Sequence, residues 1–176
     1  MSVPEELLGA REVATAAAME ELGREIGRRL VAGDVLVLTG PLGAGKTTLT
    51  RGLADGLGVR GPVQSPTFVL ARTHPSLGDG PPLVHMDAYR LGSAAELDDL
   101  DVDAERSVVV VEWGRGLAED LADVWWDIEV ERPVGAGAGS AGADSAGADG
   151  TAVPDEELDA DAPRIVTIRR LTSATR

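Results

Sequence analysis

The stretch GPLGAGKTT, from Gly40 to Thr48, constrains the fold of this chain more than any other part of its sequence. It matches the pattern G-x-x-x-x-G-K-[ST] through Gly40, Gly45, Lys46 and Thr47. The apolar run VLVLTG before it is typical of a strand, and the run KTTLTRGLADGLG after it predicts a helix. Because a strand, a glycine-rich loop and a helix in this order form a phosphate-binding loop, the sequence predicts an α/β domain of the P-loop type.

Lys46 is the only lysine among 16 cationic side chains, and the others are arginines. Lysine places a compact charge on a flexible stem, which suits the β- and γ-phosphates of a nucleotide better than the broad guanidinium fork does. Glycines and the N-terminus of the following helix present backbone N–H groups to the same anion, and Thr47 offers a hydroxyl to Mg²⁺. The residues expected around the phosphates are Gly40, Leu42, Gly43, Ala44, Gly45, Lys46, Thr47 and Thr48.

Two carboxylates follow apolar runs, where a P-loop protein needs an acid for its metal shell. Glu112 ends VVVVE and Asp87 ends LVHMD, and ligands of open α/β sheets bind at such strand ends. Glu112 is the preferred metal acid, together with Thr47, whereas Asp87 could also be a plain hydrogen-bond acceptor. His74 and His85 lack the spacing of metal ligands and are interpreted as structural. The expected catalytic residues are Lys46, Glu112 and Asp87.

The remaining sequence fits one domain, since 176 residues can bury a sizeable core. The runs VWWDIEVE and RIVTIRRL predict the last two strands. Between them, residues 134–163 are rich in Gly, Ala and Ser with scattered acids, a composition that cannot bury a core, so a flexible insertion loop is predicted. An amphipathic helix is predicted from apolar residues at every fourth position, namely Ala14, Ala18, Leu22, Ile26 and Leu30.

Charge and composition exclude several classes of protein. The formal net charge is −14, and seven acids without a base lie between Pro133 and Pro163. Because the remainder is also acidic, direct high-affinity binding of nucleic acid by this chain alone is not expected. The absence of cysteine excludes disulfides and thiolate metal sites. The acidic N-terminus lacks the apolar region of a signal peptide, and no apolar run has the length of a membrane span, so a cytoplasmic protein is expected.

Two other nucleotide-binding classes fit less well. A GTPase reads guanine with an Asn-Lys-x-Asp motif, and the chain has no second lysine for it. The residues WGRG after Glu112 also exclude the D-x-x-G switch. A small nucleotide kinase would suit the length of the chain. It usually needs an arginine-rich lid, however, where this sequence has the acidic Gly/Ala insertion.

Four motifs, taken together and in order, resemble the TsaE (YjeE) family of bacterial ATPases. They are GPLGAGKTTLTRGLADGLGV, SPTF, HMDAYRL followed by AAELDDLD, and VVVVEWG. The resemblance covers roughly residues 20–131 and the last strand, and leaves the insertion outside it. It implies a compact α/β P-loop domain with a mixed, mostly parallel sheet flanked by helices.

The resemblance also implies a function in tRNA modification. Members of the family bind Mg·ATP and hydrolyse it slowly, and partner proteins activate them. They act with the TsaD–TsaB pair, which transfers a threonylcarbamoyl group to adenosine 37 of tRNAs that read ANN codons. The ATP cycle resets that complex between turnovers, so tRNA is met only through the complex. A nucleotide-dependent switch module, in which hydrolysis is incidental, remains the alternative function. The oligomeric state stays open, and the chain alone could be a monomer.

The resemblance assigns further residues to the nucleotide. Ser65 and Thr67 of SPTF correspond to a switch-like loop near the γ-phosphate, and Asp87 to a position beside the nucleotide or the partner. Arg164, at the start of the last strand, corresponds to an arginine near the nucleotide. Trp113, which follows Glu112, is expected to pack next to the site.

Overall fold

A computed structural model of the chain describes residues 3–66, 70–90, 102–116, 121–132 and 162–173. Thr67 and nearly all of the predicted insertion, residues 134–161, lie outside the described residues. The elements in chain order are the 3-10 turn η1 (Glu5–Leu7), β1 (Gly9–Val13), α1 (Ala16–Gly27), β2 (Val35–Thr39), α2 (Lys46–Leu57), β3 (Ala71–His74), β4 (Leu83–Asp87), the 3-10 turn η2 (Ala88–Arg90), β5 (Val108–Glu112), β6 (Val124–Glu131) and β7 (Arg164–Thr172).

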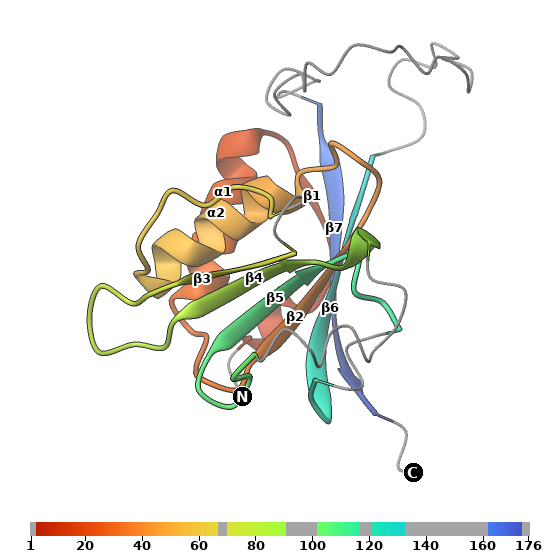
Figure 1. Cartoon of the computed structure of the whole chain (residues 1–176). Helices are drawn as coiled ribbons and strands as arrows, with labels where there is room; N and C mark the ends of the chain where they lie inside the picture. Colours follow the sequence, from red (N-terminus) through yellow and green to blue (C-terminus); the bar gives the residue numbers. More distant parts are fainter. Residues whose placement is uncertain (1–2, 67–69, 91–101, 117–120, 133–161, 174–176) are drawn as a thin grey trace, which may run out of the picture.

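Among the described residues, seven strands form one sheet in the order β1-β7-β6-β2-β5-β4-β3 (Figure 1). The four central strands β6, β2, β5 and β4 are parallel to one another. The flanking strands β7, β1 and β3 pair antiparallel. The predicted fold class, a mixed and mostly parallel sheet flanked by helices, is therefore confirmed.

Strand β1 was not predicted from the sequence. It lies at the edge of the sheet and pairs with β7, from Gly9 opposite Ile168 to Val13 opposite Arg164. Only Val13 of its five residues is buried, so the segment shows no apolar alternation. Its pairing depends on β7, which is more than 150 residues further along the chain, so local sequence carries no signal for it.

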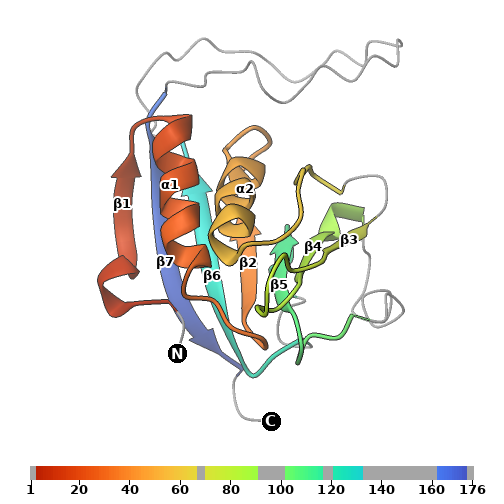
Figure 2. The same cartoon turned by 90° about the vertical axis from the view of Figure 1, so that its left-hand side faces the viewer.

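Helices α1 and α2 pack side by side on one face of the sheet (Figure 2). The face predicted for the first helix was partly wrong, because Ala18 is exposed and Ala14 precedes the helix. Steps of four residues advance slightly more than one turn and drift away from the buried face. The residues of α1 that are buried are Met19, Leu22, Gly23, Ile26 and Gly27.

Glycines let the backbones of the two helices touch. A Cβ built on Gly23 of α1 would lie 2.3 Å from the carbonyl oxygen of Leu49, and one on Gly52 of α2 would lie 2.1 Å from that of Glu20. Both distances are far below any real Cβ contact, so these positions admit only glycine at the present helix separation. Glycine is counted neither as apolar nor as polar in a periodicity analysis, which is why this interface was missed.

We expect Gly52→Ala to lower the melting temperature by roughly 4–8 °C. The clash with backbone puts the cost of overpacking near the upper end of about 1–3 kcal/mol. The gain in helix propensity offsets about 1 kcal/mol of this cost, and the remaining ~2 kcal/mol lowers the melting temperature by about 2–4 °C per kcal/mol in a chain of this size. Gly78→Ala is the matched control, because its Cβ would meet no atom within 4 Å and its melting temperature should stay close to that of the wild type. Thermal unfolding followed by circular dichroism measures both. A Gly52→Ala variant as stable as the wild type would contradict the backbone contact.

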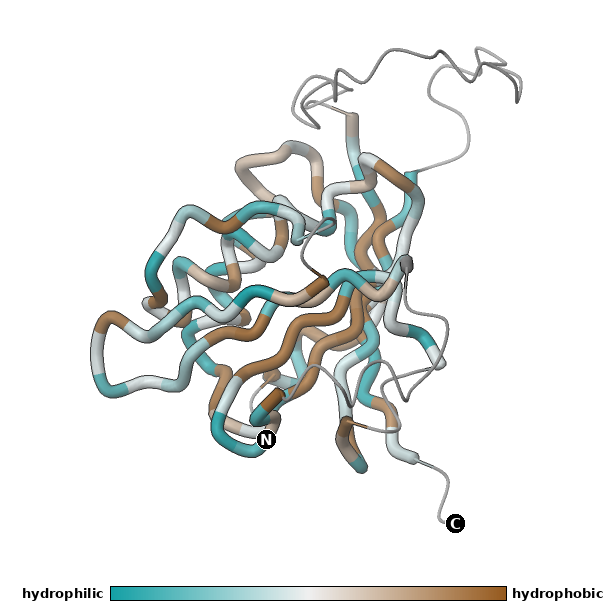
Figure 3. Tube along the Cα trace, viewed as in Figure 1, coloured by the Kyte–Doolittle hydropathy of each residue, from teal (hydrophilic) through white to brown (hydrophobic). Residues whose placement is uncertain are grey.

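The sheet has an apolar core on each face. On the helix side, Leu36 and Leu38 of β2 and Val110 of β5 pack with both helices. On the opposite side, Val37 and Val111 pack with a second cluster, against which residues of the segments 102–104 and 121–122 are placed. The central strands are the most hydrophobic part of the trace (Figure 3). Among the described residues, no helix combines the length and the apolar character needed to cross a bilayer.

His74, at the end of β3, is expected to make the stability of the fold depend on pH. Its ring is buried, its Nδ1 bonds the carbonyl oxygen of Arg60 at 3.0 Å, and its Nε2 has no partner within the described parts of the chain. Burial lowers the pKa of His74 below its ordinary value of 6.5. As the pH falls below about 6.5, the unfolded chain takes up the proton first, so acidification destabilises the folded state.

We therefore expect the wild type to lose more thermal stability between pH 7.5 and 5.5 than a His74→Asn variant does. The asparagine amide can still donate to the Arg60 carbonyl oxygen but does not titrate. Melting temperatures of both proteins across this range provide the measurement. Parallel curves would show that His74 does not contribute to the pH dependence.

Candidate functional site

The glycine-rich loop leaves β2 and enters α2 at the carboxyl edge of the parallel strands (Figure 1). Gly45 is the N-cap of α2 with φ +111°, and Gly40 has φ +144°, values that side-chain-bearing residues rarely adopt. A Cβ on Gly40 would also lie 2.2 Å from the carbonyl oxygen of Val130, so the loop packs directly on β6. The N–H of Ala44 donates to the carbonyl oxygen of Pro41 at 3.1 Å and closes the turn.

Lys46 folds back over this loop. Its side chain is buried, and Nζ donates to the carbonyl oxygens of Gly40 and Pro41, at 3.0 Å each. Nζ also lies 4.1 Å from the centroid of the Trp113 ring, within cation–π distance. Trp113 in turn meets the ring of Tyr89 edge-on, with centroids 5.6 Å apart. These contacts fix the ammonium group of the single lysine at the mouth of the loop, and they place Trp113 beside it.

Thr47, Glu112 and His85 meet at one carboxylate oxygen. The Thr47 hydroxyl donates to Oε1 of Glu112 at 3.2 Å, and Nε2 of His85 lies 2.9 Å from the same oxygen. Since a carboxylate only accepts, Nε2 of His85 is the donor. A hydroxyl that donates its hydrogen bond to a carboxylate keeps its lone pairs for a cation. The structure thus brings together the two residues predicted for the metal, and adds a third.

His85 was missed as part of this site. Its interpretation as a structural residue rested on the lack of metal-ligand spacing, yet it is fully buried against Glu112. The signal was present in LVHMD, because residues two apart in a strand share a face, and His85 therefore lies on the same face as Asp87. The register of β4 and β5, which places Asp87 opposite Glu112, was needed to turn that signal into a contact.

Asp87 lies opposite Glu112 in the sheet and makes a hydrogen bond of its own. It is buried at the end of β4, and Oδ1 accepts the backbone N–H of Tyr89 at 3.0 Å. This bond caps the turn η2 and matches the alternative considered for Asp87, a strand-end acceptor. Its position opposite Glu112 also leaves it at the carboxyl edge where ligands of such sheets bind.

The other predicted positions differ in burial and in their place relative to the loop. Leu42 is exposed at the tip of the loop, and Thr48 is half-buried in the first turn of α2. Ser65 is half-buried in the segment that leads from α2 toward β3. Arg164 is buried, and its Nε donates to the carbonyl oxygen of Ala44 at 3.1 Å. Arg164 therefore touches the backbone of the loop.

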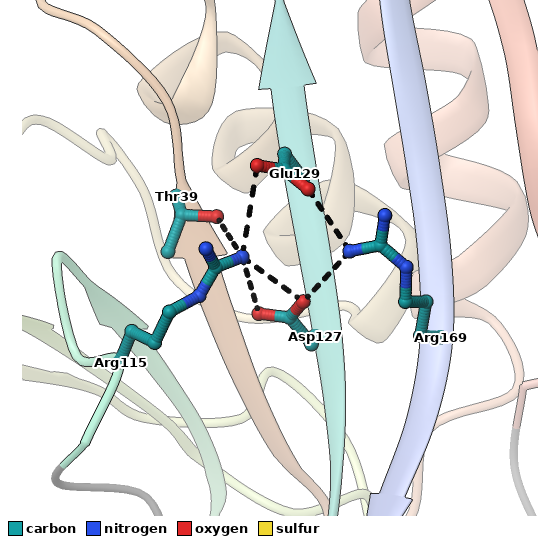
Figure 4. A network of polar contacts seen from close by, with 5 residues as sticks. All are labelled: Thr39, Arg115, Asp127, Glu129 and Arg169. Carbon is teal, nitrogen blue, oxygen red and sulfur yellow. Dashed lines mark hydrogen bonds and ion pairs between the residues drawn. The ribbon is translucent and has the colours of Figure 1, made fainter.

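The sequence analysis also missed a polar network on the face of the sheet opposite the helices (Figure 4). Arg115 donates to the Thr39 hydroxyl at 3.1 Å and to Asp127 at 3.2 Å. Arg169 reaches the same aspartate at 3.3 Å and Glu129 at 2.9 Å. Thr39 is the residue before the loop, so the network ties the start of the loop to β6 and β7. The alternation in VWWDIEVE marked the polar face of β6, but its partners come from two other segments.

The donor set fits magnesium. In the described ranges, no three His, Asp or Glu side chains are grouped to hold a metal ion by themselves. Mg²⁺ in phosphate sites uses one or two protein oxygens and takes the rest from phosphates and water. The Thr47 hydroxyl and the Glu112 carboxylate, already in hydrogen-bond contact, supply hard oxygen atoms of this kind.

A glycine loop between a central parallel strand and a helix, with a lysine and a threonine at the helix start, defines a P-loop NTPase-like domain. The profile of the family described as "Threonylcarbamoyl adenosine biosynthesis protein TsaE" matches residues 13–136, more than half of the chain. The chain belongs to the TsaE family.

Individual relatives agree with this placement. A protein of Streptomyces coelicolor is 61% identical over 120 residues, which cover 66% of this chain and 81% of the relative. A protein of Mycobacterium tuberculosis is 55% identical over 120 residues, covering 63% of this chain and 71% of the relative. Both are named tRNA threonylcarbamoyladenosine biosynthesis protein TsaE. Among solved structures, YdiB of Bacillus subtilis superposes with a TM-score of 0.58 at 27% identity, covering 90% of this chain and 82% of YdiB.

Proposed function

We propose that this chain is an Mg-dependent ATPase that acts with the TsaD–TsaB pair in forming the threonylcarbamoyl group on adenosine 37 of tRNAs that read ANN codons. Membership in the TsaE family supports a role in tRNA threonylcarbamoyladenosine biosynthesis. One observation supports the finer assignment of ATP binding and hydrolysis, whereas the resetting of the complex between turnovers follows from the family resemblance alone. Lys46, Thr47 and Glu112 meet at a single glycine-rich loop.

The loop and Lys46 would bind the phosphates of ATP. The N-terminus of α2 offers backbone N–H groups that have no partner within the helix, and its dipole favours an anion. Nζ of Lys46 is held at the loop by two carbonyl oxygens and by Trp113, so its charge lies at the loop before a nucleotide enters. When ATP binds, Nζ would exchange these carbonyl oxygens for phosphate oxygens and stabilise the developing charge of phosphoryl transfer.

Thr47 and Glu112 would hold the metal ion. When bound, Mg²⁺ neutralises charge on the β- and γ-phosphate oxygens. In this chain Oε1 of Glu112 accepts a hydrogen bond from the Thr47 hydroxyl, which leaves the hydroxyl lone pairs for a cation. Nε2 of His85 donates a second hydrogen bond to the same Oε1. Oε2 of Glu112 would then accept from a metal-bound or attacking water.

The acidic character of the chain supports indirect contact with tRNA. A net charge of −14 repels a polyanion, so a basic surface must come from partner proteins. The chain would thus contribute nucleotide chemistry, and the TsaD–TsaB pair would contribute the tRNA and the transfer step.

The proposal is tested by measuring phosphate release and modified adenosine in parallel. The chain is assayed alone, with TsaD–TsaB, and with TsaD–TsaB, tRNA and a threonylcarbamoyl donor. We expect slow hydrolysis by the chain alone, faster hydrolysis with the pair, and repeated rounds of tRNA modification only with hydrolysable ATP. If a non-hydrolysable ATP analogue supports as many rounds as ATP, the chain is a nucleotide-dependent switch and hydrolysis is incidental.

A further inference from the structure

Two arginines hold consecutive carbonyl groups of the P-loop from outside. Arg132 directly follows β6, and its Nη2 donates to the carbonyl oxygen of Gly43 at 3.2 Å. Arg164 opens β7, and its Nε donates to the carbonyl oxygen of Ala44 at 3.1 Å. The two residues therefore reach the loop from the adjoining ends of neighbouring antiparallel strands.

The loop and the end of β6 are in tight contact around these bonds. A Cβ on Gly43 would lie 3.3 Å from Nη2 of Arg132, and one on Gly40 would lie 2.2 Å from the carbonyl oxygen of Val130. Arg164 is buried, and its Nη1 also donates to the carbonyl oxygens of Ala162 at 2.5 Å and of Pro163 at 3.4 Å. Its guanidinium group thus joins the loop to the backbone that precedes β7.

Because peptide groups are planar, these two hydrogen bonds also set the directions of the N–H groups of Ala44 and Gly45. In a planar trans peptide the C=O of one residue and the N–H of the next point in opposite directions. Holding the Gly43 carbonyl toward Arg132 turns the Ala44 N–H the other way, where it meets the carbonyl oxygen of Pro41 at 3.1 Å. Holding the Ala44 carbonyl toward Arg164 turns the Gly45 N–H away from β7 in the same manner.

We propose that Arg132 and Arg164 are positioning residues that preorganise the P-loop for phosphate. Arg132 stabilises the turn closed by Ala44, and Arg164 fixes the peptide that presents the N–H of Gly45 at the start of α2. This role differs from the contact with the nucleotide that the sequence suggested for Arg164. The proposal rests on the proposed nucleotide-binding function, since a preorganised loop matters only when phosphate binds there.

Preorganisation is the reason to expect an effect on affinity. A loop whose peptide planes are already oriented loses less conformational freedom when a ligand binds. Guanidinium groups suit the task because they present several N–H donors in a rigid fork and always carry their charge. Lysine at the same positions keeps the charge but reaches with a flexible stem, so Arg→Lys should restore only part of the effect.

The test uses Arg164→Met, Arg132→Met, the double variant and Arg164→Lys, with ADP and Mg·ATP as probes. Arg170→Met is the matched control, because Arg170 lies on β7 at an exposed position. Titration calorimetry should show ADP affinity falling about tenfold for each single methionine variant, the scale of one hydrogen bond to a charged group. The Michaelis constant for ATP should rise more than the turnover number falls.

A second readout separates positioning from a merely structural role. In ¹⁵N-labelled protein without nucleotide, the amide of Gly45 should shift and exchange faster in Arg164→Met, and that of Ala44 in Arg132→Met. Arg170→Met should leave both amides and the ADP affinity as in the wild type. Because Arg132 is exposed, we expect its variant to stay folded, so it tests the proposal even if Arg164→Met lowers the melting temperature.

The outcomes distinguish this proposal from the function on which it rests. Wild-type ADP affinity and unchanged loop amides in the folded double variant would overturn the role of the two arginines alone. An equal loss of affinity in Arg170→Met would overturn it too, since the effect would then be one of net charge. A wild-type chain that binds neither ADP nor ATP would overturn the proposed function together with this inference.

Discussion

Replacing Lys46 by alanine is expected to weaken ATP binding by about 100-fold while the protein stays folded. The variant removes the only ammonium group at the loop, where it is held by the carbonyl oxygens of Gly40 and Pro41. A charged hydrogen bond to phosphate contributes about 1.5–3 kcal/mol, so affinity should fall by about 100-fold. Titration calorimetry with ATP and Mg²⁺ gives the affinity, and circular dichroism gives the melting temperature.

Two further variants separate the role of Lys46 from a general effect of charge. Lys46→Arg keeps the charge but brings a broad fork beneath the ring of Trp113, so it should also lose most of the affinity. Arg28→Ala is the control for net charge, because it removes one positive charge from an exposed side chain at the end of α1. It should bind ATP like the wild type. Unchanged ATP affinity in Lys46→Ala would disprove the assignment of the loop.

Glu112→Gln is expected to lower basal ATP hydrolysis by about 100- to 1,000-fold, the range measured when one preorganised group of an active site is removed. The amide keeps the shape of the side chain but cannot supply the negative charge that orients Thr47 and a cation. The loop and Lys46 still bind the phosphates, so ATP affinity should change by less than about tenfold. Phosphate release and calorimetric titration measure the two quantities.

Asp87→Asn provides the matched comparison, because it removes the same charge from the opposite position in the register. Asp87 accepts a backbone N–H of the turn η2, so its variant should keep Mg·ATP binding and much of the basal hydrolysis. We expect it to lose stimulation by TsaD–TsaB. The reverse pattern, wild-type hydrolysis in Glu112→Gln and none in Asp87→Asn, would assign the metal acid to β4.

Local sequence was sufficient for the P-loop and for the strands around it. Strand β2, the loop and α2 are contiguous, and their periodicity, glycines and helix cap all lie within residues 35–58. The strand-end acids Glu112 and Asp87 were located from apolar runs that end in a carboxylate. Both acids were expected at the same edge of the sheet, because ligands bind at the carboxyl ends of parallel strands. That Asp87 lies directly opposite Glu112 depends on the register of β4 and β5, which the sequence does not fix.

The contacts that join distant segments could not be derived in the same way. His85 and Glu112 are 27 residues apart, and Arg115 meets Thr39 across 76 residues. Each contact depends on strand order and register, which are tertiary properties. The glycine interface of α1 and α2 was missed for a different reason, because periodicity analysis looks for side chains and this interface is made by their absence.

The position of the one lysine under an indole ring also has a use in protein chemistry. Apart from the α-amino group, Lys46 carries the only primary amine of the chain, and it is buried against Trp113. An acylating reagent added to the native protein can therefore modify a side chain only when this loop opens and uncovers the amine. Peptide mapping by mass spectrometry would distinguish acylated Lys46 from an acylated α-amino group, so slow acylation of Lys46 would report each opening of the phosphate loop.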